Sequence, residues 1–424
     1  MSPARSPSKP RSPAGSLRPP TPSGADEPCV WVLKTSSAGD TNNRLAIARA
    51  IAPHHHRLVS PKDVRHDVEQ MALAYTGAAR LDQVTNWPDI FLICEQETSK
   101  YGRGIKELSA GHTFVVGMQT PDIDNNDFDN NVGDYTDYQT DMQVVWSHLK
   151  TAAPTPQARN HGLFRHQADT LPSPITPELL SDAADKAPAS LQQLRGKRPI
   201  YAVLIGGLID SEHRFHHSNW YDYADEKQLV RDNLTALIDQ VAAQAAKDNG
   251  AVVVTTSHRS PHQFSALISD RLTAVPHVFY DWSQKRGSQN PYHAMLALAD
   301  QIVVTSDSLS MTADALATGK PVFSFLAQEK RAGEQPRKLP ARLRQTAMIK
   351  PETACYLSAQ AAQGRGFPMA QLGNRRLKIP PRVDGAKTIA EAITQAHGAY
   401  RYERAAPRQT IGTPMAPRRS TTRP

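Results

Sequence analysis

Residues 290–325 constrain the fold of this chain more than any other stretch. They read as helix, strand, polar turn, helix and strand, and the apolar, β-branched run at 302–305 is typical of a parallel strand buried on both faces. The turn after that strand consists of Thr305, Ser306, Asp307 and Ser308. These residues offer N-caps to a helix that we expect to begin near Ser310. Because the first amides of a helix are unpaired and carry the positive end of its dipole, the turn predicts an anion site without a lysine.

The rest of the chain alternates apolar runs with helical patterns, which is typical of parallel α/β sheets. Further strands are predicted at 29–33, 89–94, 112–118, 142–146, 200–205, 251–256 and 277–280. Further helices are predicted at 44–51, 100–109, 227–247 and 387–397, with loops at 154–199 and from 330 to about 382. Because 424 residues exceed what one hydrophobic core usually spans, we expect two Rossmann-like domains that face each other across a cleft.

The predicted division of the chain follows from composition. It comprises a basic, Pro- and Ser-rich disordered tail at 1–27, an N-terminal domain at 28–195, a C-terminal domain at 196–385, a helix at 386–400 and a basic disordered tail at 401–424. The formal charge of +8 belongs to the tails. The two tails hold four and six of the 49 basic residues, and two and one of the 41 acidic residues. The middle of the chain therefore keeps 39 basic and 38 acidic residues. This near-neutral middle argues against a nucleic-acid partner.

The cysteine spacing, the absence of a membrane-spanning run and the N-terminal tail bear on the cellular compartment. The three cysteines are far apart, which fits a reducing compartment, and no run reaches the length of a membrane span, so we expect a soluble cytoplasmic protein. The N-terminal tail is Arg- and Ser-rich like a transit peptide, but seven prolines before residue 23 prevent an amphipathic helix, and a disordered extension is favoured over import.

Three polar segments invite a metal hypothesis. They are His54 to His56, the Asp-rich loop at 121–138, and the group of His213, His216 and His217. None fits a strong ligand template, and the acidic loop lacks the Gly and Glu that a calcium loop requires, so solvated loops are favoured and no metal is expected.

Three further turns lie where other predicted strands end. Gly206 and Gly207 follow the strand at 200–205, and two adjacent glycines allow a ligand to approach the backbone closely. Arg259 follows the strand at 251–256 with Ser257, where it either pairs with a phosphate, the favoured interpretation, or is solvated beside a helix start. A turn at 38–39 either approaches a ligand or only connects elements.

These motifs together resemble the mitochondrial fission Elm family. The resemblance covers roughly residues 29–330 and is weaker before 200. The segments that carry it are Asn290, Pro291 and Tyr292, residues 299–300, the turn at 305–308, and residues 318–321, 204–207 and 255–261. The family is similar to glycosyltransferases of the GT-B fold, whose second domain binds the nucleotide sugar. The resemblance therefore implies a cytoplasmic, soluble glycosyltransferase-like protein of bacterial cell-envelope or glycoconjugate metabolism, with a nucleotide-sugar donor, an unassigned acceptor and no cofactor.

The turn also resembles the Asp-Ser-Gly-Gly-x-x-Glu-Glu element of nonhydrolysing UDP-N-acetylglucosamine epimerases. Ser308 matches the serine, Leu309 and Ser310 stand in place of the glycines, and Asp314 stands at the last glutamate. This resemblance implies that Ser308 and nearby amides hold a diphosphate and that Asp314 accepts the ribose hydroxyls, although the missing glycines and the shorter Asp depart from the pattern. His258 also departs, since the Elm family usually has an arginine there.

The implied nucleotide-sugar site contains sixteen residues, none of them assigned as a catalytic base. They are Gly206, Gly207, Ser257, Arg259, Asn290, Pro291, Tyr292, Thr305, Ser306, Asp307, Ser308, Ser310, Met311, Asp314, Gly319 and Lys320.

Three alternatives to an enzyme stay open on the sequence. One is a non-catalytic interaction protein whose basic tails contact a partner or a membrane surface. The second is nucleotide binding without transfer, and the third is a well-capped helix that binds nothing. A Rossmann dehydrogenase is disfavoured, because no G-x-G-x-x-G follows either domain's first strand.

Overall fold

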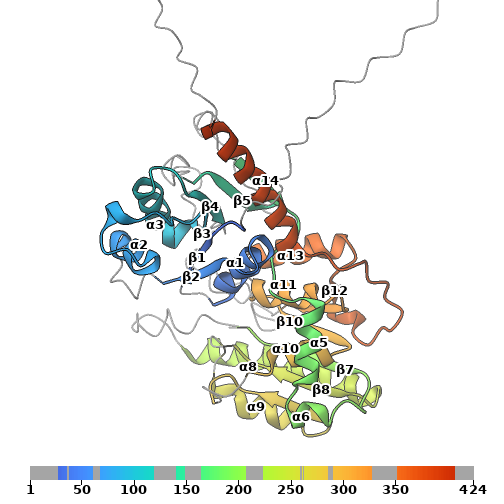
Figure 1. Ribbon diagram of the computed structural model, residues 1–424. Helices are drawn as coiled ribbons and strands as arrows, with labels where there is room; N and C mark the ends of the chain where they lie inside the picture. The colour runs from blue at the N-terminus through green and yellow to red at the C-terminus, as the bar shows by residue number, and fades with distance from the viewer. Residues whose placement is uncertain are drawn as a thin grey trace, which may run out of the picture.

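The computed structural model describes residues 27–35, 38–60, 67–118, 140–148, 164–206, 223–257, 260, 262–284, 290–326 and 351–405. Within them the chain forms two six-stranded sheets in which every neighbouring pair of strands is parallel (Figure 1). The prediction of two Rossmann-like α/β units, each built on a parallel sheet, is confirmed.

The first sheet has the order β2-β1-β3-β4-β5-β6. Its strands are β1 (Val30–Leu33), β2 (His56–Val59), β3 (Ile90–Cys94), β4 (Phe114–Met118), β5 (Met142–Trp146) and β6 (Phe164–Ala168). The helices of this part are α1 (Ala38–Ile51), α2 (Val68–Thr76), the short η2 (Leu81–Gln83) and α3 (Glu95–Leu108). Alternate strand residues divide between two cores: one face packs with α1, and the other packs with α2 and α3.

The second sheet has the order β12-β11-β10-β7-β8-β9. Its strands are β7 (Ile200–Leu204), β8 (Ala251–Thr255), β9 (His277–Tyr280), β10 (Gln301–Thr305), β11 (Val322–Phe325) and β12 (Phe367–Pro368). Its helices are α5 (Pro177–Asp185), α6 (Ala189–Gln192), α8 (Tyr223–Lys247), η5 (His262–Phe264), α9 (Ser265–Arg271), α10 (Tyr292–Leu298), α11 (Leu309–Ala317) and η6 (Met369–Gln371). Between β11 and β12 lies α13 (Pro351–Ala362), whose buried Tyr356 belongs to a core of the first sheet. One face packs under α8 and α9, and the other under α5, α6, α10 and α11.

The last helix, α14 (Gly385–Ala405), returns to the first sheet. Its buried Ile389 and Ile393 belong to the core formed by α1 and the first sheet, and Figure 1 shows it in dark red beside β4 and β5. The chain therefore crosses between the sheets twice, at 169–175 and 380–385. The crossings touch, because a Cβ added to Gly385 would lie 2.5 Å from the carbonyl oxygen of Leu171.

Several local expectations were wrong. The expected turn at 38–39 lies inside α1, and His56 opens an edge strand although His54 and His55 are exposed. The loop expected at 154–199 contains β6, α5 and α6, and the loop expected after 330 contains α13 and β12. In α5 a proline marks a helix start rather than a loop: Thr176 caps the helix by accepting from the Leu179 amide, and Pro177, which has no N–H, takes the first position.

Candidate functional site

The candidate site lies where the order of the second sheet reverses. From β7 the chain builds β8 and β9 on one side and then returns to place β10 on the other, so the ends of β7 and β10 form the switch point at which open α/β sheets bind ligands. Gly206 follows β7, and Ser306 and Asp307 follow β10. We call these three residues the switch-point cluster.

The backbone of Gly206 is fixed by hydroxyl groups from both neighbouring strands. Its amide donates to Thr305 Oγ1 at 2.8 Å, and its carbonyl oxygen accepts from Ser260 Oγ at 2.5 Å. Ser260 Oγ in turn accepts from the amide of Ser257 at 2.9 Å. The Gly206 amide is thus already hydrogen-bonded within the protein.

The need for glycine at 206 has another cause. A Cβ placed there would lie 2.4 and 2.6 Å from the two carboxylate oxygens of Asp307, closer than such atoms can approach. The Asp307 side chain is only 6% exposed, so a carboxylate lies against the backbone at the switch point.

Ser306 is the most enclosed member of the switch-point cluster. Its side chain is 0% exposed, and its Oγ has no hydrogen-bond partner among the residues that the structure describes. Buried hydroxyl groups are nearly always hydrogen-bonded, so an orphaned one next to a helix start points to an absent partner.

The start of α11 follows at once. Ser308 is its N-cap in extended conformation, as predicted, but its side chain makes no capping bond to the helix. Its carbonyl oxygen accepts from the amide and the hydroxyl of Thr312. The serine hydroxyl thus leaves the first-turn amides uncapped, near the partly buried Ser310 and Met311.

Asp314 is placed differently from the expected ribose ligand. One carboxylate oxygen accepts from Ser173 Oγ at 2.6 Å and the other from the Tyr292 hydroxyl at 3.0 Å. Burial raises the pKa of Asp314 to about 6, although both hydrogen bonds oppose the shift. Burial, with the neighbouring carboxylate, raises the pKa of Tyr292 well above its usual value. Asp314 therefore joins α11 to α10 and to the first crossing between the sheets.

The remaining expected residues are only partly gathered. Asn290 and Pro291 lie at the start of α10, where the Asn290 side chain accepts from the amide of Tyr292. Gly207 and Arg259 lie outside the described residues, as do His258, the acidic loop at 121–138 and the group of His213, His216 and His217.

Gly319 and Lys320 lie at the opposite edge of the sheet, between the end of α11 and the start of β11. Nine helical residues, about 13 Å, separate this end from Ser308. The Lys320 amine donates to the carbonyl oxygens of Leu296 and Ala297 at the end of α10, and burial lowers its pKa to about 8. The structure therefore does not bring Gly319 and Lys320 together with the turn at 305–308.

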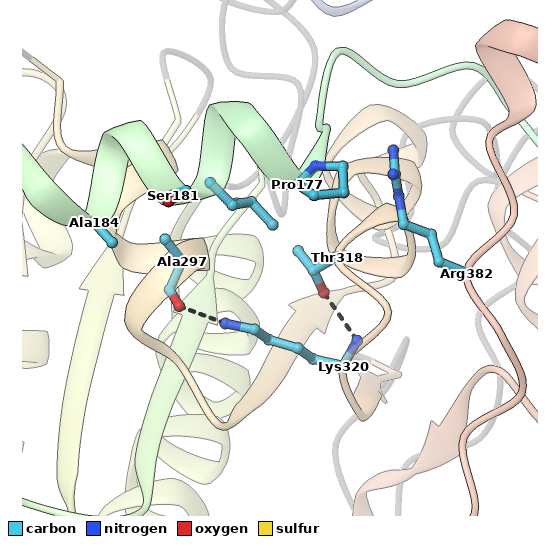
Figure 2. Close-up of a pocket in the computed structure, with 8 residues that line it drawn as sticks. Pro177, Ser181, Ala184, Ala297, Thr318, Lys320 and Arg382 are labelled. Atoms are coloured by element: carbon cyan, nitrogen blue, oxygen red, sulfur yellow. Dashed lines mark hydrogen bonds between the residues drawn. The ribbon is translucent and has the colours of Figure 1, made fainter.

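Lys320 also lines a cavity of about 270 Å³ at this amino edge (Figure 2). Arg382 lies across the cavity, where its guanidinium donates to the carbonyl oxygens of Ala317 and Ile175. Both cations are thus engaged by backbone carbonyls, and they hold helix ends in place rather than forming an anion site.

Two residues beside the first sheet were not predicted from sequence, the buried Arg44 and the half-buried His148. Arg44, 2% exposed, donates to the Leu33 carbonyl oxygen at 3.2 Å and to Thr35 Oγ1 at 3.0 Å at the carboxyl end of β1. His148, just beyond β5, packs on Tyr356 of α13 with ring centroids 5.0 Å apart. Neither His148 nitrogen has a partner among the described residues, and burial lowers its pKa to about 4.

The described part of the chain holds no group of three or more His, Cys, Asp or Glu side chains placed to bind a metal ion. Likewise, no helix within the described ranges combines the length and apolar character needed to cross a bilayer.

Comparison with known proteins gives relatives at moderate distance. The mitochondrial fission protein ELM1 of Arabidopsis thaliana is 26% identical over 254 residues, 58% of this chain, so the match spans about half (53%) of that relative. An uncharacterized protein of Rickettsia prowazekii (strain Madrid E), RP120, is 21% identical over 312 residues, 70% of this chain and 82% of its own.

Solved structures of similar architecture are more remote. A UDP-GlcNAc 2-epimerase from Methanocaldococcus jannaschii has a TM-score of 0.42 at 9% identity, covering 87% of this chain and 99% of its own. MurG of Acinetobacter baumannii has a TM-score of 0.36 at 11% identity, covering 88% and 95%.

The family model described as mitochondrial fission ELM1 matches residues 38–396, which include the first part of the returning helix and every described strand except β1. The chain therefore belongs to the mitochondrial fission ELM1 family.

Proposed function

We propose that the switch point of the second sheet binds a nucleotide-activated sugar and that the protein is a glycosyltransferase-type enzyme. The observation that carries this proposal is the juxtaposition of uncapped α11 amides with the orphaned, fully buried Ser306 hydroxyl. Helix-start amides favour an anion, and a buried hydroxyl favours a ligand that hydrogen-bonds.

In this proposal the diphosphate lies at the start of α11, near Ser308, Ser310 and Met311. Helix-start amides stabilise the charge that develops on a departing diphosphate, and they do so without a metal ion. The first sheet, which meets α11 through α1, would present the acceptor.

The test is a thermal-shift screen of the full chain with UDP, GDP, ADP and a sugar conjugate of each. We expect at least one nucleotide to raise Tm, since a ligand that binds only the folded state stabilises it. Ser308→Ala should weaken that nucleotide's binding while changing stability little, because the hydroxyl makes no capping bond to α11.

Ser181→Ala is the matched control, since Ser181 lines the cavity at the opposite edge and should leave nucleotide binding unchanged. Unaltered affinity in Ser308→Ala would rule out the phosphate position. Absence of any nucleotide effect on the wild type would favour the non-catalytic interaction protein instead.

A further inference from the structure

We infer that Asp307 makes the protein bind a nucleotide sugar more tightly than the bare nucleotide. Its carboxylate would do so by accepting hydrogen bonds from hydroxyl groups of the sugar that is attached to the diphosphate. This inference rests on the proposed function and names the part of the ligand that the switch-point cluster recognises. It differs from the expectation drawn from the epimerase-like motif, in which the hydroxyl-binding carboxylate is Asp314.

The position of Asp307 is the first argument. Its carboxylate oxygens lie 2.4 and 2.6 Å from where a Cβ of residue 206 would be, beyond the carboxyl ends of the paired parallel strands β7 and β10. A ligand that enters an open α/β sheet at its switch point approaches the ends of these two strands. The carboxylate is therefore placed beside the ligand's path and is held there by close packing.

Charge decides which part of the ligand can lie there. A diphosphate is anionic, and a carboxylate that is 6% exposed would repel it with little screening from solvent. Sugar hydroxyl groups are neutral and donate hydrogen bonds, whereas an ionised carboxylate only accepts them. The diphosphate should thus lie toward the first turn of α11, with the sugar toward Gly206.

Ser306 complements this carboxylate. A sugar hydroxyl both donates and accepts, and the pair of a carboxylate with a neighbouring serine hydroxyl provides one acceptor and one donor. The Ser306 Oγ has no partner in the described structure, so it is available for this role. A carboxylate has about four acceptor positions, so Asp307 can serve protein and ligand donors together.

Asp314 is the less suitable carboxylate. Both of its oxygens already accept hydroxyl protons, from Ser173 at 2.6 Å and from Tyr292 at 3.0 Å. A ribose would have to displace one of these contacts, and Ser173 belongs to the crossing between the sheets. Asp314 therefore provides a matched control with the same side-chain chemistry.

The experiment measures Kd by calorimetry on the full chain for one nucleotide and its sugar conjugate, UDP against UDP-N-acetylglucosamine or GDP against GDP-mannose. In the wild type we expect the conjugate to bind more tightly. In Asp307→Asn the conjugate should bind at least fivefold more weakly, while the bare nucleotide binds as well or better because the repelling charge is gone. Asp314→Asn should keep the wild-type preference, and Ser306→Ala should reduce it.

The outcomes separate the two proposals. If the wild type binds no nucleotide, the proposed function is wrong and this inference is wrong with it. If nucleotides bind and Asp307→Asn keeps the preference for the conjugate, the inference is overturned while the proposed function stands. An equal loss of both affinities, with circular dichroism showing a folded protein, would make Asp307 a structural residue and would also overturn the inference.

Discussion

The two sheets place opposite charges at corresponding edges. At the carboxyl end of β1, the first strand of the first sheet, the buried charge is the guanidinium of Arg44, which donates to protein oxygens. At the end of β7, the first strand of the second sheet, it is the carboxylate of Asp307, which lies against Gly206. Both strands are the first strands of parallel sheets, so the topology places their carboxyl ends at equivalent positions. The side chains at each end then decide which ligand it can recognise. In the first sheet the hydrogen bonds of Arg44 stabilise this edge. In the second sheet the Ser306 hydroxyl at this edge has no hydrogen-bond partner among the described residues.

The largest expected effect is at Arg44. Arg44→Ala removes two charge-assisted hydrogen bonds from a buried position, and we expect the free energy of unfolding to fall by about 3 kcal/mol. Urea unfolding followed by circular dichroism measures it. Arg80→Ala is the control, because the Arg80–Asp82 pair is exposed and should change stability by no more than about 0.5 kcal/mol. A similar loss of unfolding free energy in the two variants would contradict a structural role for Arg44.

The second prediction concerns acid stability. Burial lowers the pKa of His148 and of His397, the latter in α14, from 6.5 to about 4. The unfolded chain therefore binds more protons between these values, and stability should fall as pH drops from about 6.5 to about 4, on the order of 2 kcal/mol for each histidine. Urea unfolding across this range, with His148→Gln and His397→Gln, should show a flatter dependence on pH.

Asp314 should act in the opposite sense. Its folded pKa of about 6 exceeds the ordinary value of 3.8, so its contribution to stability is fully present below about 3.8 and is lost as pH rises through about 6. Asp314→Asn should therefore steepen the loss of stability on acidification over that window. If the histidine variants and Asp314→Asn changed the dependence of stability on pH in the same direction, these assignments of the pH dependence would be wrong.

The third prediction addresses the reason for glycine at 206. Gly206→Ala should cost about 2 kcal/mol, because the new Cβ must displace the Asp307 carboxylate. Gly196→Ala is the control, since nothing lies within 4 Å of a Cβ added there. In a double-mutant cycle, Asp307→Ala should recover part of the loss, and additive costs would mean that the close approach is not the cause.

The smallest effect is expected at Ser306. Ser306→Ala removes an orphaned hydroxyl, so stability should stay level or rise by up to about 1 kcal/mol. Binding of the sugar conjugate should weaken in the same variant. A clear loss of stability would show that the hydroxyl already has a partner in the free protein, which would weaken the contrast between the two edges.

The central strands and the helix start were predictable because their signals are local. The run at 302–305 carries its own β-branched pattern, and Ser308 occupies the N-cap position of α11 as its place in the sequence implies. The edge strands of the first sheet gave no such signal: β2 (HRLV) and β6 (FRHQA) are polar enough to read as loops.

Within the site, residue types were easier to predict than their partners. Gly206 was expected to let a ligand approach the backbone, and in the structure the side chain next to it is that of Asp307, 101 positions away. Asp314 was expected to face a ligand, yet its partners Ser173 and Tyr292 come from two other segments. His148 gave no signal because it packs on Tyr356, 208 residues further along. Such contacts depend on how distant segments pack.

The return of α14 to the first sheet has a consequence for biosynthesis. Between the end of β6 at Ala168 and the start of α14 at Gly385 the ribosome adds 217 residues, which takes about 10 to 40 s. Until then the places of Ile389 and Ile393 in the core of the first sheet are empty, and apolar side chains of β1, β3 and β4 stay accessible to chaperones or to other nascent chains. The first sheet is therefore begun first but completed last.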